Sequence, residues 1–90
     1  MNKTTILAGA LVGLGVVSSA QAANDCEALW YQRNTIFKAH GYCFHTARSL
    51  RAFSNNGCKF DDAAHVPLSA KDRAVIAVIQ ARERFYGCDG

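Results

Sequence analysis

Four cysteines limit the folds open to this 90-residue chain more than any other feature. An even number of cysteines in a short exported chain is typical of paired disulfides. A domain of this size buries only about 60% of its unfolded surface, so its core alone gives marginal stability. Two disulfides worth about 2–4 kcal/mol each would change that balance. We therefore expect a structural role for the cysteines, which are Cys26, Cys43, Cys58 and Cys88.

The first 22 residues have the three parts of a secretory signal peptide. Lys3 gives a positive start, residues 6–17 form an uncharged apolar run, and Ala20-Gln21-Ala22 is a small-x-small cleavage site. An uncleaved anchor is the alternative, but this run is shorter than the roughly 20 residues that span a bilayer. We expect residues 1–22 to be removed. Residues 23–90 would then be one soluble domain, periplasmic or secreted, with no stable membrane insertion.

The charge of the processed chain argues against nucleic acid as a partner. Residues 23–90 contain nine Lys and Arg against seven Asp and Glu, a net charge of +2. Nucleic-acid binding needs a clustered basic face. These charges are spread along the chain instead, which is typical of an ordinary solvated surface.

The first helix is expected over residues 24–40. Asn24 can cap it, with Glu27 as a capping partner, and Gly41 suits a left-handed stop. Arg33 and His40 fall inside the apolar face of this helix, so two cations need partners there. The apolar members of that face, placed at about 100° per residue, are Cys26, Leu29, Trp30, Ile36 and Phe37.

A short second helix is expected after Thr46, which can cap it. Its apolar positions are Ala47, Leu50 and Phe53, and residues 54–57, Ser-Asn-Asn-Gly, end it in a turn where Asn and Gly suit positive dihedrals. Residues 58–67 are interpreted as an ordered loop held by a cysteine.

A third helix is expected to open at Ser69, with Asp72 as its capping partner, and to end at Gly87. Asp72 and Glu83 lie on its apolar face, so this helix carries buried-side anions where the first carries cations. The apolar members of that face are Val75, Ile76, Ile79 and Tyr86. The prediction is an all-α, small three-helix domain with ordered loops, stapled by two disulfides.

Geometry leaves two disulfide connectivities open. Cys26 and Cys43 bracket a helix on the order of 20 Å long. Bridged Cα atoms lie within about 7 Å of each other, so a continuous helix excludes a Cys26–Cys43 disulfide. Cys26–Cys88 with Cys43–Cys58 would hold the first and third helices antiparallel. Cys26–Cys58 with Cys43–Cys88 would suit a parallel arrangement. We prefer the antiparallel one, which sets Arg33 beside Glu83 and His40 near Asp72.

The stretch from Leu29 to Phe44 reads Leu-Trp-Tyr-Gln-Arg-Asn-Thr-Ile-Phe-Lys-Ala-His-Gly-Tyr-Cys-Phe and resembles the YARHG domain, a small extracellular bacterial module. Leu50-Arg51-Ala52-Phe53 and Leu68-Ser69 also fit that layout, so the resemblance runs from about Leu29 to about Ile79. Two features depart from the family. Its Ala-Arg-His-Gly is Lys38-Ala39-His40-Gly41 here, and the four cysteines suggest a disulfide-bonded subgroup. The resemblance implies fold and location and carries no established activity.

Five side chains of this stretch are candidates for binding: Tyr31, Arg33, Asn34, His40 and Tyr42. Tyr31 lies away from the apolar face, and Asn34, at its edge, could bond the backbone of the following turn. The aromatic residues of the stretch would form a sugar- or peptide-binding platform or simply core.

Metal binding and catalysis are weaker interpretations. His40, Cys43, His45 and Cys58 would suit zinc, but cysteines in an oxidising compartment should be paired. A cysteine nucleophile needs a free thiol, and the adjacent Asp61 and Asp62 are expected to be solvated. We therefore predict no catalytic residues, no metal and no cofactor.

The function predicted from these features is an exported, non-catalytic binding or structural module of the bacterial cell envelope. Its partner would be an envelope or cell-wall component, either cell-wall polymer or an envelope protein. One alternative is a secreted inhibitor or stress protein that occludes a partner enzyme. A small hydrolase is another, and it would need a polar groove lined by free carboxylates.

Overall fold

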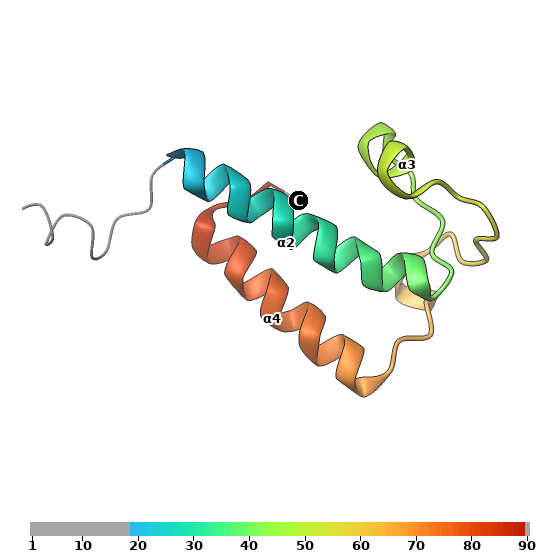
Figure 1. Ribbon diagram of the computed structural model, residues 1–90. Coiled ribbons are helices and arrows are strands. Elements are labelled where there is room, and N and C mark those ends of the chain that lie inside the picture. The colour runs from blue at the N-terminus through green and yellow to red at the C-terminus, as the bar shows by residue number, and fades with distance from the viewer. Residues whose placement is uncertain (1–18, 90) are drawn as a thin grey trace, which may run out of the picture.

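The computed structural model describes residues 19–89, and these form three α-helices with connecting loops (Figure 1). The helices are α2 (Ser19–Ala39), α3 (Ala47–Phe53) and α4 (Ala70–Tyr86), with a 3-10 turn η1 (Ala63–His65) in the loop before α4. No strand occurs in this part of the chain, where the one pairing of β type is an isolated bridge between Tyr42 and Phe60. The all-α, three-helix prediction is confirmed.

The long helices α2 and α4 run antiparallel and form the body of the molecule, with α3 on another side of α2 (Figure 1). Leu29 and Trp30 of α2 and Ile76 and Ile79 of α4 are buried in the core. Val75, expected on the buried face, is 40% exposed. Helix α2 covers a narrow face of α4, the buried seam, which contains Ile76, Ile79 and Glu83. Val75 lies just outside this seam.

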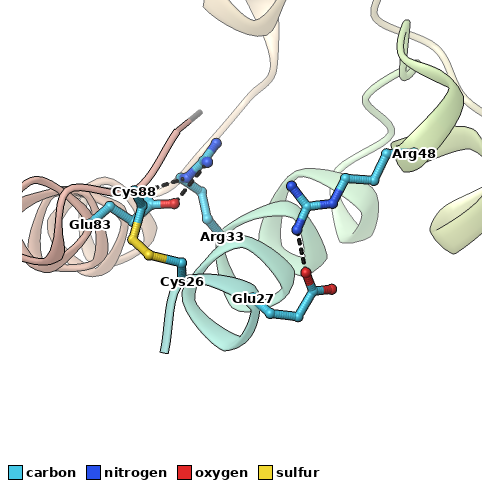
Figure 2. Close-up of a disulfide and its surroundings, with 6 residues drawn as sticks. All are labelled: Cys26, Glu27, Arg33, Arg48, Glu83 and Cys88. Atoms are coloured by element: carbon cyan, nitrogen blue, oxygen red, sulfur yellow. Dashed lines mark hydrogen bonds and ion pairs between the residues drawn. A yellow bond between two sulfur atoms is a disulfide. The ribbon is translucent and has the colours of Figure 1, made fainter. Parts of the chain in front are cut away.

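The two disulfides have the antiparallel connectivity. Cys26–Cys88 joins the N-terminal half of α2 to the second residue after the end of α4, with Cα atoms 5.4 Å apart (Figure 2). Cys43–Cys58 closes the segment that contains α3, with Cα atoms 5.1 Å apart. The parallel alternative is therefore excluded, and each disulfide stabilises a different part of the fold.

The start of α2 corrects the sequence prediction. The helix begins at Ser19 instead of at an Asn24 cap, so the expected cleavage site lies inside it. Three alanines, residues 20, 22 and 23, precede Asn24, and alanine has the highest helix propensity. Helix propagation through them therefore overrides the capping pattern. Most of the predicted signal peptide, residues 1–18, lies outside the described residues.

The turn after α2 depends on Gly41, whose φ of +88° lies in the left-handed region. A Cβ atom here would also meet the Phe60 ring at 3.4 Å. The Gly41 carbonyl accepts hydrogen bonds from the backbone N–H groups of Lys59 (2.7 Å) and Phe60 (3.0 Å). The expected stop is confirmed, and it also fastens the loop around Cys58 to the end of α2.

Helix α3 begins as predicted at Thr46, whose hydroxyl accepts from the backbone N–H of Ser49. Its end differs from the prediction. The two residues with positive φ in the turn are Ser54 and Gly57, and neither asparagine has positive φ. The Asn55 side chain instead pairs with the backbone of Phe44, accepting at 2.7 Å and donating at 3.0 Å. This pairing holds the two sides of the α3 segment together.

Both ends of α4 agree with the sequence prediction. The Ser69 hydroxyl accepts from the backbone N–H of Asp72 at 3.0 Å, and Gly87 adopts the left-handed conformation at the C-terminus. The loop between α3 and α4 is ordered as expected, and η1 within it is capped by Asp62. None of the helices in residues 19–89 is long and apolar enough to cross a membrane.

Candidate functional site

Arg33 of α2 pairs with Glu83 of α4 as the antiparallel register predicts. Its Nε and Nη2 atoms donate to the two carboxylate oxygens, each at 2.9 Å (Figure 2). The side chains are 16% and 11% exposed, so the pair lies in the interface of the two helices. A bidentate guanidinium–carboxylate contact fixes both side chains in one geometry. The pair therefore sets the register of α2 on α4.

His40 forms the second predicted pair, with its Nε2 atom 2.8 Å from the carboxylate of Asp72. Hydrogen bonds from the side chain and backbone of Ser69, together with the nearby His40, hold the pKa of Asp72 below its ordinary value of 3.8. Asp72 thus serves both the N-terminus of α4 and the C-terminus of α2. His40 lies at the far end of the hairpin from the disulfide Cys26–Cys88.

Asn34 is buried, and its Nδ2 atom donates to the carbonyl of Trp30 at 2.9 Å. We expected a bond to the following turn. The structure shows one to the preceding turn of the same helix, because a side chain on a helix points back toward its N-terminus. The bond leaves the amide of Asn34 at the wall of a cavity.

Arg33, Asn34 and Tyr42 come together at two adjoining cavities, which we name the central pocket. One, of about 150 Å³, is also lined by Trp30, Phe44, His45, Thr46 and Ser49. The other, of about 220 Å³, is also lined by Phe37, Ala63 and Gln80. The central pocket thus collects residues of α2, the loops on both sides of α3, and α4. Three of the five predicted binding residues meet here.

Tyr31 and His40 lie outside the central pocket. Tyr31 is 51% exposed, and its ring stacks on Phe53 with centroids 4.9 Å apart. Phe53 in turn stacks on Phe44 at 5.1 Å, and Phe44 meets the Tyr42 ring at 5.0 Å. A continuous row of aromatic rings therefore runs from the exposed Tyr31 to the pocket residue Tyr42, joining core and surface.

Sequence reasoning considered His45 only as a zinc ligand, and it missed the polar residues that α3 contributes. The Arg48 guanidinium carbon lies 3.7 Å from the centroid of the Trp30 ring, and the same side chain pairs with Glu27 of α2 (Figure 2). The rim residue His45 bonds the carbonyl of Asp61 through Nε2 at 2.7 Å. A signal existed for Ser49, since it stands three residues after the capping Thr46. Helical periodicity could not predict that Arg48 and His45 lie near α2, because tertiary packing places them there.

The chemistry available at the central pocket is recognition by aromatic faces and hydrogen-bonding groups. Cys43 and Cys58 are joined to each other, which removes the thiolates that the zinc interpretation requires. In residues 19–89 no group of three His, Cys, Asp or Glu side chains could hold a metal ion. Glu83, the carboxylate nearest to the pocket residue Arg33, is bound to its guanidinium.

Comparison with known proteins gives one match. The family model described as the YARHG domain matches residues 5–84, which include α2, α3 and most of α4. No curated protein matches the chain, and no solved structure does. The matched range begins inside the segment predicted as a signal peptide and includes every residue of the central pocket.

Proposed function

The chain belongs to the YARHG domain family, and on this premise we propose that it is an exported binding module of the bacterial cell envelope. The central pocket would hold part of a larger envelope ligand, either cell-wall polymer or an envelope protein. The module would act by binding, without catalysis and without a cofactor.

The disulfides and the family support the proposed location. Two disulfides in a domain of this size fit an extracellular or periplasmic protein, because such bonds persist in oxidising compartments. The family match is consistent with that location. The signal peptide proposed for residues 1–22 would supply the route of export.

The convergence of Arg33, Asn34 and Tyr42 on the central pocket carries the binding proposal. Sites for whole small molecules have volumes of about 300–1,000 Å³. The two cavities, at about 150 and 220 Å³, suit one sugar ring or one side chain of a larger ligand. The Tyr42 ring beside hydroxyl and amide groups matches a sugar or a short peptide, which are both components of cell wall.

Co-sedimentation with purified cell-wall sacculi tests this function. The oxidised protein, purified from the medium or periplasm of the producing cell, is pelleted with sacculi at low and moderate salt. Binding through rings and hydrogen bonds predicts pelleting that persists at moderate salt, because salt screens charge attraction and leaves these contacts intact. A protein left wholly in the supernatant would exclude cell wall and direct the search to envelope proteins.

A matched pair of histidine variants assigns the binding to the central pocket. His45→Ala removes an exposed rim group, and we expect affinity for sacculi to fall roughly fivefold, as for one lost hydrogen bond. His65→Ala removes another exposed histidine, on η1, that does not line the pocket, and it should pellet as the unaltered protein does. Equal losses in both variants would contradict the pocket as the binding site.

A further inference from the structure

Helix α4 carries more apolar surface than α2 covers. Its buried seam contains Ile76, Ile79 and the paired Glu83, which face α2. A helix that has apolar residues on two sides leaves one side exposed when a single helix packs on the other. Beyond the seam, six further apolar residues of α4 are exposed.

These six residues form one strip, which we name the outer strip. At about 100° per residue they occupy an arc of roughly 100°, opposite the seam with α2. All are exposed, and the largest two, Val78 and Phe85, are 60% and 78% exposed. The members of the outer strip are Ala70, Ala74, Ala77, Val78, Ala81 and Phe85.

Cations line both edges of the outer strip. Arg73 and Arg84 lie along one edge and Lys71 and Arg82 along the other, and all four are exposed. Both carboxylates of α4 point elsewhere, since Asp72 is paired with His40 and Glu83 with Arg33. The exposed surface of α4 therefore has four positive charges and no negative one, although the whole chain has a net charge of only +3.

The apolar surface continues into a groove between α4 and α2, and Ala74 and Val78 of the outer strip line this groove as well. This groove has a volume of about 300 Å³ and is lined mainly by apolar side chains, among them Leu29, Val75 and Ile79. Gln32 and Arg82 are the polar groups at its rim. The outer strip and the groove together give α4 an apolar surface broader than one helix face.

We propose that the outer strip of α4 binds an anionic phospholipid surface. A basic amphipathic helix with an exposed apolar strip is the pattern of helices that lie in the plane of a membrane interface. The two cationic edges would reach the lipid phosphates, while the aliphatic stems of Lys and Arg lie along the apolar boundary. Phe85 would enter the boundary between headgroups and acyl chains.

Charge decides between this occupant and a second copy of the chain. In a dimer formed through the outer strip, the four cations of one α4 would face the four of the other, and like charges across a helix pair disfavour pairing. The strip also runs along the helix from Ala70 to Phe85, which suits an extended surface. The site is separate from the central pocket, so either assignment can fail without the other.

Vesicle sedimentation tests this proposal. The processed, oxidised protein, with its N-terminus at residue 23 verified by mass spectrometry, is mixed with phosphatidylglycerol-containing vesicles and with pure phosphatidylcholine vesicles. We expect sedimentation with the anionic vesicles only, weakening as salt is raised because the attraction is partly electrostatic. An absence of binding to the anionic vesicles would overturn the proposal.

Two pairs of substitutions locate the binding surface. Arg73→Gln with Arg84→Gln should reduce partition to anionic vesicles by roughly 25-fold, at about fivefold for each cation. Arg51→Gln with Lys59→Gln makes the same change of net charge on α3 and in the loop after it, and should leave most of the binding. Circular dichroism verifies that both variants fold. Equal losses in the two variants would overturn the assignment to α4.

Two further outcomes would assign the outer strip to another occupant. Retention by immobilised poly-L-glutamate without vesicle binding would identify an acidic polypeptide as the partner. A dimer in analytical ultracentrifugation that Val78→Glu dissociates would identify a second copy of the chain. Phe85→Ser supplies an uncharged check, because lipid insertion predicts a several-fold loss of vesicle binding with the net charge unchanged.

Discussion

Arg33 and Glu83 place opposite charges in the interface between α2 and α4, where an unpaired charge would be costly. The two hydrogen bonds of 2.9 Å satisfy the carboxylate and hold it on the guanidinium. His40 and Asp72 form a more exposed pair near the other end of the same interface. Together the two pairs disfavour any other register of the helices, because sliding would separate both at once.

Reversing both charges of the buried pair tests its role. Arg33→Glu or Glu83→Arg alone should cost about 3–5 kcal/mol of unfolding free energy, because each leaves two like charges in the interface. The double variant should recover part of that loss. Urea unfolding measures all three. Glu27→Gln, which breaks the exposed pair with Arg48, should cost less than about 1 kcal/mol. A double variant no more stable than the worse single one would contradict the pairing.

Asp72 gives the fold a dependence on acid pH. Its pKa is lowered in the folded state, so its stabilisation is complete above the unfolded value of 3.8 and is lost as pH falls through the lower folded value. Asp72→Asn should therefore be less stable than the unaltered protein at about pH 6, with a smaller difference at about pH 3. Asp61→Asn, at an exposed loop position, is the control. A difference for Asp72→Asn that stays constant over this range would contradict the account.

At the scale of elements, the helices follow from caps and periodicity. Ser69 and Gly87 define α4, and Thr46 opens α3, as the sequence predicts. The start of α2 was predicted wrongly, because the alanines before Asn24 favour helix more strongly than the capping pattern favours a helix start at Asn24. The central pocket could not be predicted from periodicity, since α3 and the loops bring His45 and Ser49 to α2 through tertiary packing.

The cap of α4 can be tested by one substitution. Ser69→Ala removes the hydroxyl that accepts from the backbone N–H of Asp72, and should cost about 1 kcal/mol of unfolding free energy. Ser54→Ala removes a hydroxyl at the end of α3 that accepts only a long 3.4 Å contact, and should cost less. Thermal and urea unfolding of the two variants give the comparison. Equal losses would show that the hydroxyl of Ser69 has no special role.

At the scale of the whole molecule, residues 19–89 form a two-helix hairpin that is closed at one end by Cys26–Cys88 and extended at the other by the α3 segment around Cys43–Cys58. Part of its arrangement was predictable, because the length of the first helix excludes one pairing, and the antiparallel choice between the remaining two led to the correct partners for the inward charges. The apolar groove beside the outer strip was less evident, because Val75 looks like a core position until the width of the α2 contact is known.

The two disulfides should differ in their contribution to stability. Cys26–Cys88 closes a segment with a sequence separation of 62, and Cys43–Cys58 one of 15. Chain entropy then predicts losses of about 4 and about 3 kcal/mol when each is removed. Paired Cys→Ser variants, compared by urea unfolding, test the order. A larger loss from the Cys43 and Cys58 pair would show that the α3 segment, and not the hairpin, limits stability.

The most direct test of the central pocket uses Trp30, the single tryptophan of the chain, which lines it. Soluble fragments released from sacculi by a muramidase are titrated into the oxidised protein while tryptophan emission is recorded. We predict a saturable change in emission, weakened in His45→Ala and unaltered in His65→Ala. Emission that stays constant while intact sacculi still pellet the protein would show that the cell wall binds elsewhere on the molecule, and would contradict the account.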